Sequence, residues 1–148
     1  MGSLFEGWKT GSAGHLTNRA ARLFAWAIDL KFKPLGVSAG QIPVFFALGA
    51  GESLTQKELV EVAAVEQPTM AAILTRMERA GLVERRPDPR DGRSSLVQLT
   101  AKAMKKVPDM VEAIQTGNRE ALAGFSEAEK AAFLDMLRRI IANLQAMG

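Results

Sequence analysis

The sequence predicts a mainly α-helical fold that carries one small β-hairpin. Three observations support this prediction. Apolar residues recur at intervals of three and four in several segments, three capping boxes mark helix starts, and a tip rich in Gly, Pro and Asp separates two short alternating segments. The 148 residues suffice for one compact domain with helical extensions. We therefore expect an α+β domain flanked by helices at both ends.

The composition excludes several classes of function. The chain has no cysteine, which excludes disulfides, thiolate metal sites and redox sensing through cysteine. Its one histidine, His15, cannot form a zinc site of the usual kind, and a lone surface histidine is a poor candidate for a catalytic triad. The sequence also offers no paired carboxylates in a plausible cleft and no phosphate-binding loop. We expect no catalytic residue, no metal and no cofactor.

Charge and hydropathy say little about the partner. A net charge of +3 is common among proteins that never bind nucleic acid. No apolar run approaches the roughly 20 residues that span a bilayer, and the first residues lack the basic and apolar regions of a signal peptide. We expect a cytoplasmic protein without a membrane partner.

The N-terminal part divides into a flexible segment and a long helix. Residues 1–14 hold four glycines and little periodicity, which predicts flexibility. Residues 15–36 contain an amphipathic helix from about His15 to Phe32, which Pro34 and Gly36 end. Its apolar stripe is too wide for an isolated helix and comprises Leu16, Ala20, Leu23, Ala27 and Leu30, widened by Phe24, Trp26 and Ile28.

Residues 37–100 predict three helices and a hairpin. The capping box at Ser38–Gln41 begins a short apolar helix for the core, and the one at Thr55–Glu58 begins a second helix. After a short connection over residues 63–66, a third helix runs from Gln67 to Ala80, with Gly81 at its C-terminal cap. Strands are expected over residues 82–86 and 95–99, around a turn at residues 87–93.

Residues 101–148 predict further helices. We expect one helix after Thr100 with a bend at Pro108, then a polar stretch that Gly117 and Gly124 interrupt. A capping box beginning at Ser126 starts the last helix. The apolar stripe of this helix comprises Phe133, Leu137, Ile140, Leu144 and Met147, widened by Leu134 and Ile141.

The order of elements over residues 37–100 is that of a winged helix-turn-helix, so we expect duplex DNA as a partner. A major groove about 12 Å wide admits one helix, which needs a polar outer face and an apolar inner face. The helix from Gln67 to Ala80 divides in this way, although a surface helix of any small helical domain would as well. Its candidate DNA contacts are Gln67, Pro68, Thr69, Ala72, Thr75 and Arg76.

The hairpin strengthens this interpretation. Between Thr75 and Thr100 every basic residue is arginine, which favours phosphate contacts and insertion into a minor groove. Acidic residues nearly balance the charge, so a solvated hairpin with weak surface ion pairs is the alternative. We expect Asp91 to hold Arg93 in an extended pose. The candidate DNA contacts of the hairpin are Arg86, Arg90, Asp91, Arg93 and Ser94.

These motifs resemble those of the multiple-antibiotic-resistance regulator (MarR) family. The resemblance rests on the segments at residues 66–70, 76–85, 88–93 and 97–100, above all on Asp88-Pro89-Arg90-Asp91-Gly92-Arg93 followed by Leu99-Thr100. It implies a homodimeric transcription regulator whose terminal helices interlock, whose third helix enters the major groove and whose Arg93 reaches the minor groove. In many members a small aromatic or phenolic ligand releases the DNA.

The residues themselves also favour a dimer. Residues 15–36 and 101–148 carry wide apolar stripes, which usually mark interfaces, although the two stripes packing on each other within one subunit is the alternative. Trp26, Phe45 and Phe46 are candidates to line a ligand pocket, but core packing explains them equally well, so the ligand-binding residues stay unknown.

We therefore expect a homodimeric, sequence-specific DNA-binding regulator, a repressor that a small ligand releases from a pseudo-palindromic operator. The alternative is a winged-helix module that binds another protein, because a fold does not fix a function. Exposed apolar or aromatic residues on the third helix would favour that alternative.

Overall fold

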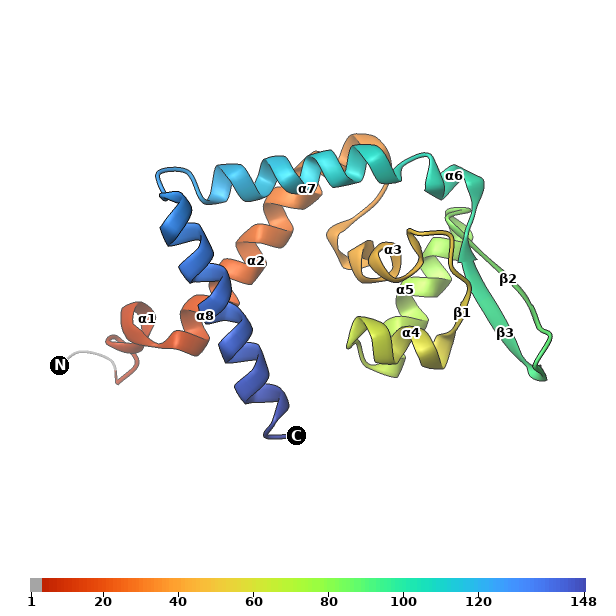
Figure 1. Ribbon diagram of the computed structural model, residues 1–148, viewed down its shortest axis with the longest axis horizontal. Coiled ribbons are helices and arrows are strands. Elements are labelled where there is room, and N and C mark those ends of the chain that lie inside the picture. The colour runs from red at the N-terminus through yellow and green to blue at the C-terminus, as the bar shows by residue number, and fades with distance from the viewer. Residues whose placement is uncertain (1–3) are drawn as a thin grey trace. The chain divides into compact units, whose positions relative to one another are not determined.

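The computed structural model describes residues 4–148 (Figure 1). The chain forms two compact units, one ending at Ile114 and one running from Gln115 to Gly148. Helices dominate and one small antiparallel sheet accompanies them, which confirms the predicted fold class. In chain order the elements are α1 (Trp8–Gly11), α2 (Ala13–Phe32), the 3-10 turns η1 (Lys33–Leu35) and η2 (Ala39–Gln41), α3 (Ile42–Leu48), β1 (Leu54–Thr55), α4 (Gln56–Ala63), α5 (Gln67–Arg79), β2 (Val83–Asp88), β3 (Asp91–Leu99), α6 (Ala101–Met104), α7 (Val107–Ala121) and α8 (Glu127–Gln145).

Helical structure begins earlier than the sequence predicts. Residues 1–3 lie outside the described part of the chain, but the rest of the expected flexible segment contains α1 and the start of α2. Ser12 is the N-cap of α2, and its hydroxyl accepts a hydrogen bond from the backbone N–H of His15 at 3.3 Å. This cap lacks the partner acidic residue of a capping box, which is why the sequence pattern did not reveal it.

The helix-turn-helix is formed by α4, a three-residue connection and α5. Thr55 and Glu58 form the predicted capping box at the start of α4: the Thr55 hydroxyl accepts from the Glu58 N–H at 3.1 Å, and the Glu58 carboxylate accepts from the Thr55 N–H at 3.3 Å. The chain leaves α4 at Ala64, whose φ of 52° places it in the left-handed region. This conformation strains any residue with a Cβ, and here it turns the chain into α5.

The sheet has three antiparallel strands in the order β1-β3-β2. Strands β2 and β3 are longer than predicted, which leaves only Pro89 and Arg90 as the tip between them. Pro87 pairs with Ser95, and a proline is tolerated there because β2 is an edge strand. Strand β1 has only two residues and was not predicted, because so short a segment has no periodicity of its own.

The hydrophobic core lies in the first unit. It joins the end of α2 to α3, α4, α5 and the sheet, and continues to Met110 in α7. The predicted core helix α3 contributes four buried side chains: Val44, Phe45, Ala47 and Leu48. The core therefore holds the helix-turn-helix against the sheet, and it fixes which face of α5 points outward.

The region after the sheet differs from the prediction in two places. A single helix bent at Pro108 was expected, but α6 ends at Met104 and α7 begins at Val107. Pro108 is the second residue of α7, where its missing N–H costs no helical hydrogen bond, so the chain restarts there instead of bending. Both Gly117 and Gly124 were expected to interrupt the polar stretch after this helix. Gly117 instead lies inside α7, whereas Gly124, with a φ of 84°, does lie between two helices.

Helix α8 starts as predicted and buries none of its residues. Its capping box pairs Ser126 with Glu129, and hydrogen bonds from the backbone N–H and then the hydroxyl of Ser126 lower the pKa of the Glu129 carboxyl. One broad apolar surface of α8 stays exposed and comprises Leu134, Met136, Ile140, Ile141 and Leu144, and Met147, just beyond the helix, is exposed as well.

The left-handed residue Ala64 yields the first prediction. Replacing Ala64 by glycine removes the Cβ strain but adds entropy to the unfolded chain, so we expect a net gain of about 0.5–1 kcal/mol in the free energy of unfolding. The matched control is the neighbouring Ala63→Gly, which lies within α4 and is expected to cost up to about 1 kcal/mol. Urea denaturation at one protein concentration measures both. A loss of stability in Ala64→Gly would contradict the assigned conformation.

Candidate nucleic-acid interface

Helix α5 presents one apolar and one polar face, as predicted. Met70, Ile73, Leu74 and Met77 are all buried. With these four side chains in the core, the opposite face of the helix must point to solvent. Five of the six predicted contact residues of this helix are exposed and one, Ala72, is half-buried; the exposed ones are Gln67, Pro68, Thr69, Thr75 and Arg76.

Four of these predicted residues lie together along one groove. Pro68, Thr69, Ala72 and Arg76 share a surface depression of about 540 Å³ with residues of η2, α3 and the segment before α5. The small side chain of Ala72 and the absence of one at Gly40 keep this depression open. This surface therefore offers a hydroxyl and a guanidinium beside two small or rigid residues, and a nucleic-acid backbone can approach such a surface closely.

The hydroxyl of Thr75 is already committed within the helix. It donates to the backbone carbonyl of Ala71 at 2.9 Å, which is a common arrangement of threonine within helices. Its hydrogen is therefore engaged, and Thr75 offers outward only its methyl group and an oxygen that accepts.

At the wing, Asp91 and Arg93 interact through the backbone. The Asp91 carboxylate accepts from the backbone N–H of Arg93 at 3.0 Å, which is an Asx turn and not an ion pair with the guanidinium. Asp91 thus fixes the chain direction at Arg93. Among residues 4–148 the Arg93 guanidinium has no hydrogen-bond or ionic partner, so its five donors remain available.

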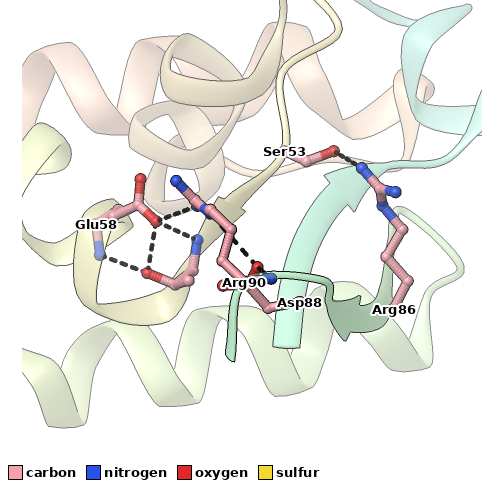
Figure 2. Close-up of polar contacts among 6 residues, drawn as sticks. Ser53, Glu58, Arg86, Asp88 and Arg90 are labelled. Atoms are coloured by element: carbon pink, nitrogen blue, oxygen red, sulfur yellow. Dashed lines mark hydrogen bonds and ion pairs between the residues drawn. The ribbon is translucent and has the colours of Figure 1, made fainter. Parts of the chain in front are cut away.

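Arg90, at the tip of the hairpin, is instead held by the protein itself. Its backbone N–H and Nε donate to the buried carboxylate of Asp88, at 2.9 and 3.5 Å. Its Nη2 lies 3.6 Å from Glu58 Oε1, the same oxygen that accepts from Thr55 in the capping box of α4 (Figure 2). A single carboxylate oxygen therefore caps α4 and attracts the guanidinium of the wing.

A second contact joins the wing to the segment before β1. Arg86 Nη2 donates to the Ser53 hydroxyl at 3.3 Å (Figure 2), and Ser53 donates onward to Gln98 on β3 at 3.0 Å. Of the predicted wing arginines, Arg86 and Arg90 therefore have side-chain hydrogen bonds within the protein. Ser94 is half-buried on β3.

Sequence reasoning missed the residues that hold these arginines. Glu58 was recognised only as part of a capping box, and Asp88 only as part of the turn and of the motif that resembles the MarR family. Their second role is to hold Arg90. For Glu58 this role depends on a contact between residues 32 positions apart, and for Asp88 it depends on burial. Neither can be predicted from the local spacing of residues. The one available signal was Asp88 preceding Pro89, because an aspartate at that place commonly folds back on the turn.

Aromatic residues of α3 line a small pocket in the first unit. Phe45 and Phe46 lie there with Ile42 and with residues of α7 up to Ile114, around a cavity of about 40 Å³. Phe45 also belongs to the core, while Phe46 is 72% exposed. Trp26, the third aromatic candidate, does not line this pocket and is 62% exposed on α2.

Residues 4–148 show neither a metal-binding cluster nor a membrane-spanning helix. No group of three or more acidic or histidine side chains is placed to hold a metal ion. No helix in this part of the chain combines the length and the apolar character needed to cross a membrane.

The fold and the polar face of α5 define a winged helix-turn-helix protein. A family model described as MarR family matches residues 35–94. The HTH-type transcriptional regulator YwoH of Bacillus subtilis, itself uncharacterised, is 33% identical over 127 residues, which cover 86% of this chain and 92% of YwoH. The chain belongs to the MarR family of transcriptional regulators.

Solved structures agree with this assignment. The PcaV transcriptional regulator of Streptomyces coelicolor, in complex with its natural ligand, superposes with a TM-score of 0.79 and 27% identity, covering 96% of this chain and 98% of PcaV. A mutant of MarR from E. coli, complexed with operator DNA, has a TM-score of 0.83 and 24% identity, covering 94% of this chain and 99% of that protein. The second likeness concerns the fold alone.

The contacts of Arg90 yield the second prediction. In Arg90→Ala the guanidinium no longer links the tip to Glu58 and Asp88, so we expect faster amide hydrogen exchange in the hairpin at residues 88–93. Because the Arg90 side chain is largely exposed, we expect a change of at most about 1 kcal/mol in global stability. Arg93→Ala is the matched control, since its guanidinium has no partner in the described chain. Equal exchange rates in the two variants would show that Arg90 does not restrain the tip.

Proposed function

We propose that this protein is a homodimeric transcriptional repressor that binds a pseudo-palindromic operator and leaves it when a small aromatic or phenolic ligand binds. The observation that carries the proposal is the division of α5, with four apolar side chains in the core and a polar face of Gln, Thr and Arg turned outward. A surface built to bind another protein would present apolar or aromatic side chains at these positions.

In this proposal α5 enters the major groove and the wing contacts the adjacent minor groove. Gln67, Pro68, Thr69, Ala72, Thr75 and Arg76 form the surface that faces the bases and phosphates, and Arg86, Arg90, Asp91, Arg93 and Ser94 form that of the wing. Arg93 makes the principal wing contact, because its guanidinium is exposed and unpartnered in the described chain and the Asp91 turn fixes its backbone. A preordered backbone lowers the entropic cost of binding.

The dimer is supported by the apolar surfaces at both ends of the chain. Helix α8 spans 19 residues without burying any, and on α2 the side chains of Leu16, Leu23, Trp26 and Leu30 are exposed as well. Apolar surface of this extent is rare on a monomer and is usually covered by a partner. We assign residues 15–36 and 101–148 to dimerisation and residues 37–100 to DNA binding. A two-fold axis then predicts half-sites about 10 bp apart.

Release by a ligand is supported by the small pocket next to α3. PcaV, a structural relative, is solved with its natural ligand. The cavity of about 40 Å³ is much smaller than the roughly 150 Å³ that accommodate benzene, so a phenolic ligand must widen it. Phe46 is the side chain most free to move aside, because it is the most exposed of the lining aromatics. Widening the pocket shifts α3 against α7 and so disturbs the support of the helix-turn-helix.

Occupation of an operator by the dimer blocks transcription sterically, which is why we propose a repressor.

Binding to DNA is tested by selecting operators from random duplexes and measuring affinity by fluorescence anisotropy at several salt concentrations. We expect a palindromic consensus and an affinity that falls steeply with salt, because arginines displace counterions from phosphates. In Arg93→Ala we expect a loss of about 1–3 kcal/mol in binding free energy. Arg138→Ala, an exposed arginine on α8, is the control and should bind like the parent. A flat salt response would favour a protein-binding module instead.

The dimer is tested by placing a charge on its proposed interface. Ile141→Glu puts a carboxylate on the exposed apolar stripe of α8, where dimerisation would bury it unpaired, so we expect the dissociation constant to rise on the order of a hundredfold or more. Arg138→Glu introduces the same side chain three positions earlier, at a site already charged, and should dimerise more nearly like the parent. Sedimentation equilibrium measures both. A parent chain that is monomeric at micromolar concentration contradicts the proposal.

A further inference from the structure

Four side chains of the helix-turn-helix and wing form a hydrogen-bond network that reaches Gln67. They are Glu78, Arg85, Gln56 and Gln67 itself. The Oε1 of Gln67, the first residue of α5, accepts from Nε2 of Gln56, the first residue of α4, at 3.1 Å. The Oε1 of Gln56 accepts from Nη2 of Arg85 on β2 at 3.4 Å. Arg85 Nε donates in turn to the carboxylate of Glu78 on α5. This hydrogen-bond network begins and ends on α5 and passes through α4 and the wing.

This arrangement fixes which end of each amide faces which neighbour. A guanidinium only donates, so the atom of the Gln56 amide that faces Arg85 must be its oxygen. The Gln56 nitrogen then faces Gln67, and it too can only donate, so Gln67 must turn its own oxygen toward α4. The orientation of a glutamine amide is usually ambiguous, but here the charge of Arg85 determines it for both glutamines.

As a consequence, the Nε2 atom of Gln67 points to solvent. Its side chain is exposed, and its Nε2 has no partner among the residues that the structure describes. A glutamine that reads adenine uses its oxygen and its nitrogen together on one base edge. The oxygen of Gln67 is drawn toward Gln56, which leaves two amide hydrogens as the part of the side chain that is free to bind.

We propose that Gln67 is a specificity-determining residue that selects a keto base, guanine or thymine, at one position of each half-site. In the major groove guanine O6 and N7 and thymine O4 accept hydrogen bonds, whereas adenine N6 and cytosine N4 donate them. A side chain that offers only donors, directed at the exocyclic group of the base, pairs with the keto oxygen of guanine or thymine and meets the amino group of adenine or cytosine donor to donor, so that adenine keeps only N7 as an acceptor. Gln56, Arg85 and Glu78 are positioning residues, since they set the direction of the Gln67 amide without contacting the base. This inference rests on the proposed DNA binding.

The test reverses the amide without changing Gln67. In Gln56→Glu the new carboxylate still accepts from Arg85 but can no longer donate to Gln67. The Gln67 amide then turns its nitrogen toward this carboxylate and its oxygen outward, so the preferred base changes from G or T to A or C at the same position. Each base pair holds one keto and one amino base, so the pair reverses between the strands. A carboxylate in the first turn of α4 suits the helix dipole, so the variant should fold.

Operators are selected from random duplexes with the full-length parent and each variant, and the read-out is the base at each symmetric position. Gln67→Ala locates the position that Gln67 reads, because the preference there disappears. We expect a parent preference of about threefold to tenfold, the scale of one hydrogen bond, and a reversal of similar size in Gln56→Glu. The double variant Gln56→Glu/Gln67→Ala carries the same added charge without the amide and should show no preference at that position.

A second variant reaches the same end by another route. Gln67→Glu leaves Gln56 and Arg85 in place and replaces the amide nitrogen by an accepting oxygen, so it too should prefer A or C. If Gln56→Glu and Gln67→Glu both keep the parent preference, or if Gln67→Ala changes no position, the inference is overturned while DNA binding stands. A parent protein that selects no consensus at all overturns the proposed function and this inference with it.

Discussion

The candidate nucleic-acid interface depends on the burial of one apolar stripe of α5. Met70, Leu74 and Met77 are completely buried and Ile73 nearly so, and each is worth about 1.5–3 kcal/mol in apolar transfer free energy. Rotating the helix by half a turn would expose all four, so the core fixes the angle at which α5 presents its polar residues. The Pro68 start, the capping box of α4 and the contacts of the wing refine a placement that this stripe has already decided.

The wing shows that arginines of one hairpin serve different ends. Arg85, Arg86 and Arg90 each bind another part of the first unit, so they make the hairpin, α4 and α5 into one connected polar surface. Arg93 extends beyond this network with its guanidinium unpartnered in the described chain. Acidic residues hold two of these arginines, since Glu78 binds Arg85 while Glu58 and Asp88 bind Arg90, and the Ser53 hydroxyl holds Arg86.

Local chemistry determined how much the sequence could predict. The three capping boxes, the apolar stripe of α5 and the Gly81 stop involve residues at most a few positions apart, and all are found where they were expected. Strand β1 depends on pairing Leu54 with Val97, and the Glu58–Arg90 contact joins α4 to the wing. Both contacts join residues far apart in the sequence, so no local spacing predicts them. The restart at Pro108 was misjudged because a proline within a helix and one in its first turn look alike in a sequence.

The exposure of α8 also bears on how the chain folds. Most helical stability in proteins comes from packing of an apolar face, yet α8 buries none of its residues. Within the described chain it is supported by its capping box, the Lys130–Glu127 pair and an edge-on contact of Phe133 with Phe125. Its helicity must therefore come from whatever covers its apolar stripe. If a second copy provides that cover, ordering of the C-terminal helix and association become a single event, and the helix content of the chain becomes a function of its concentration.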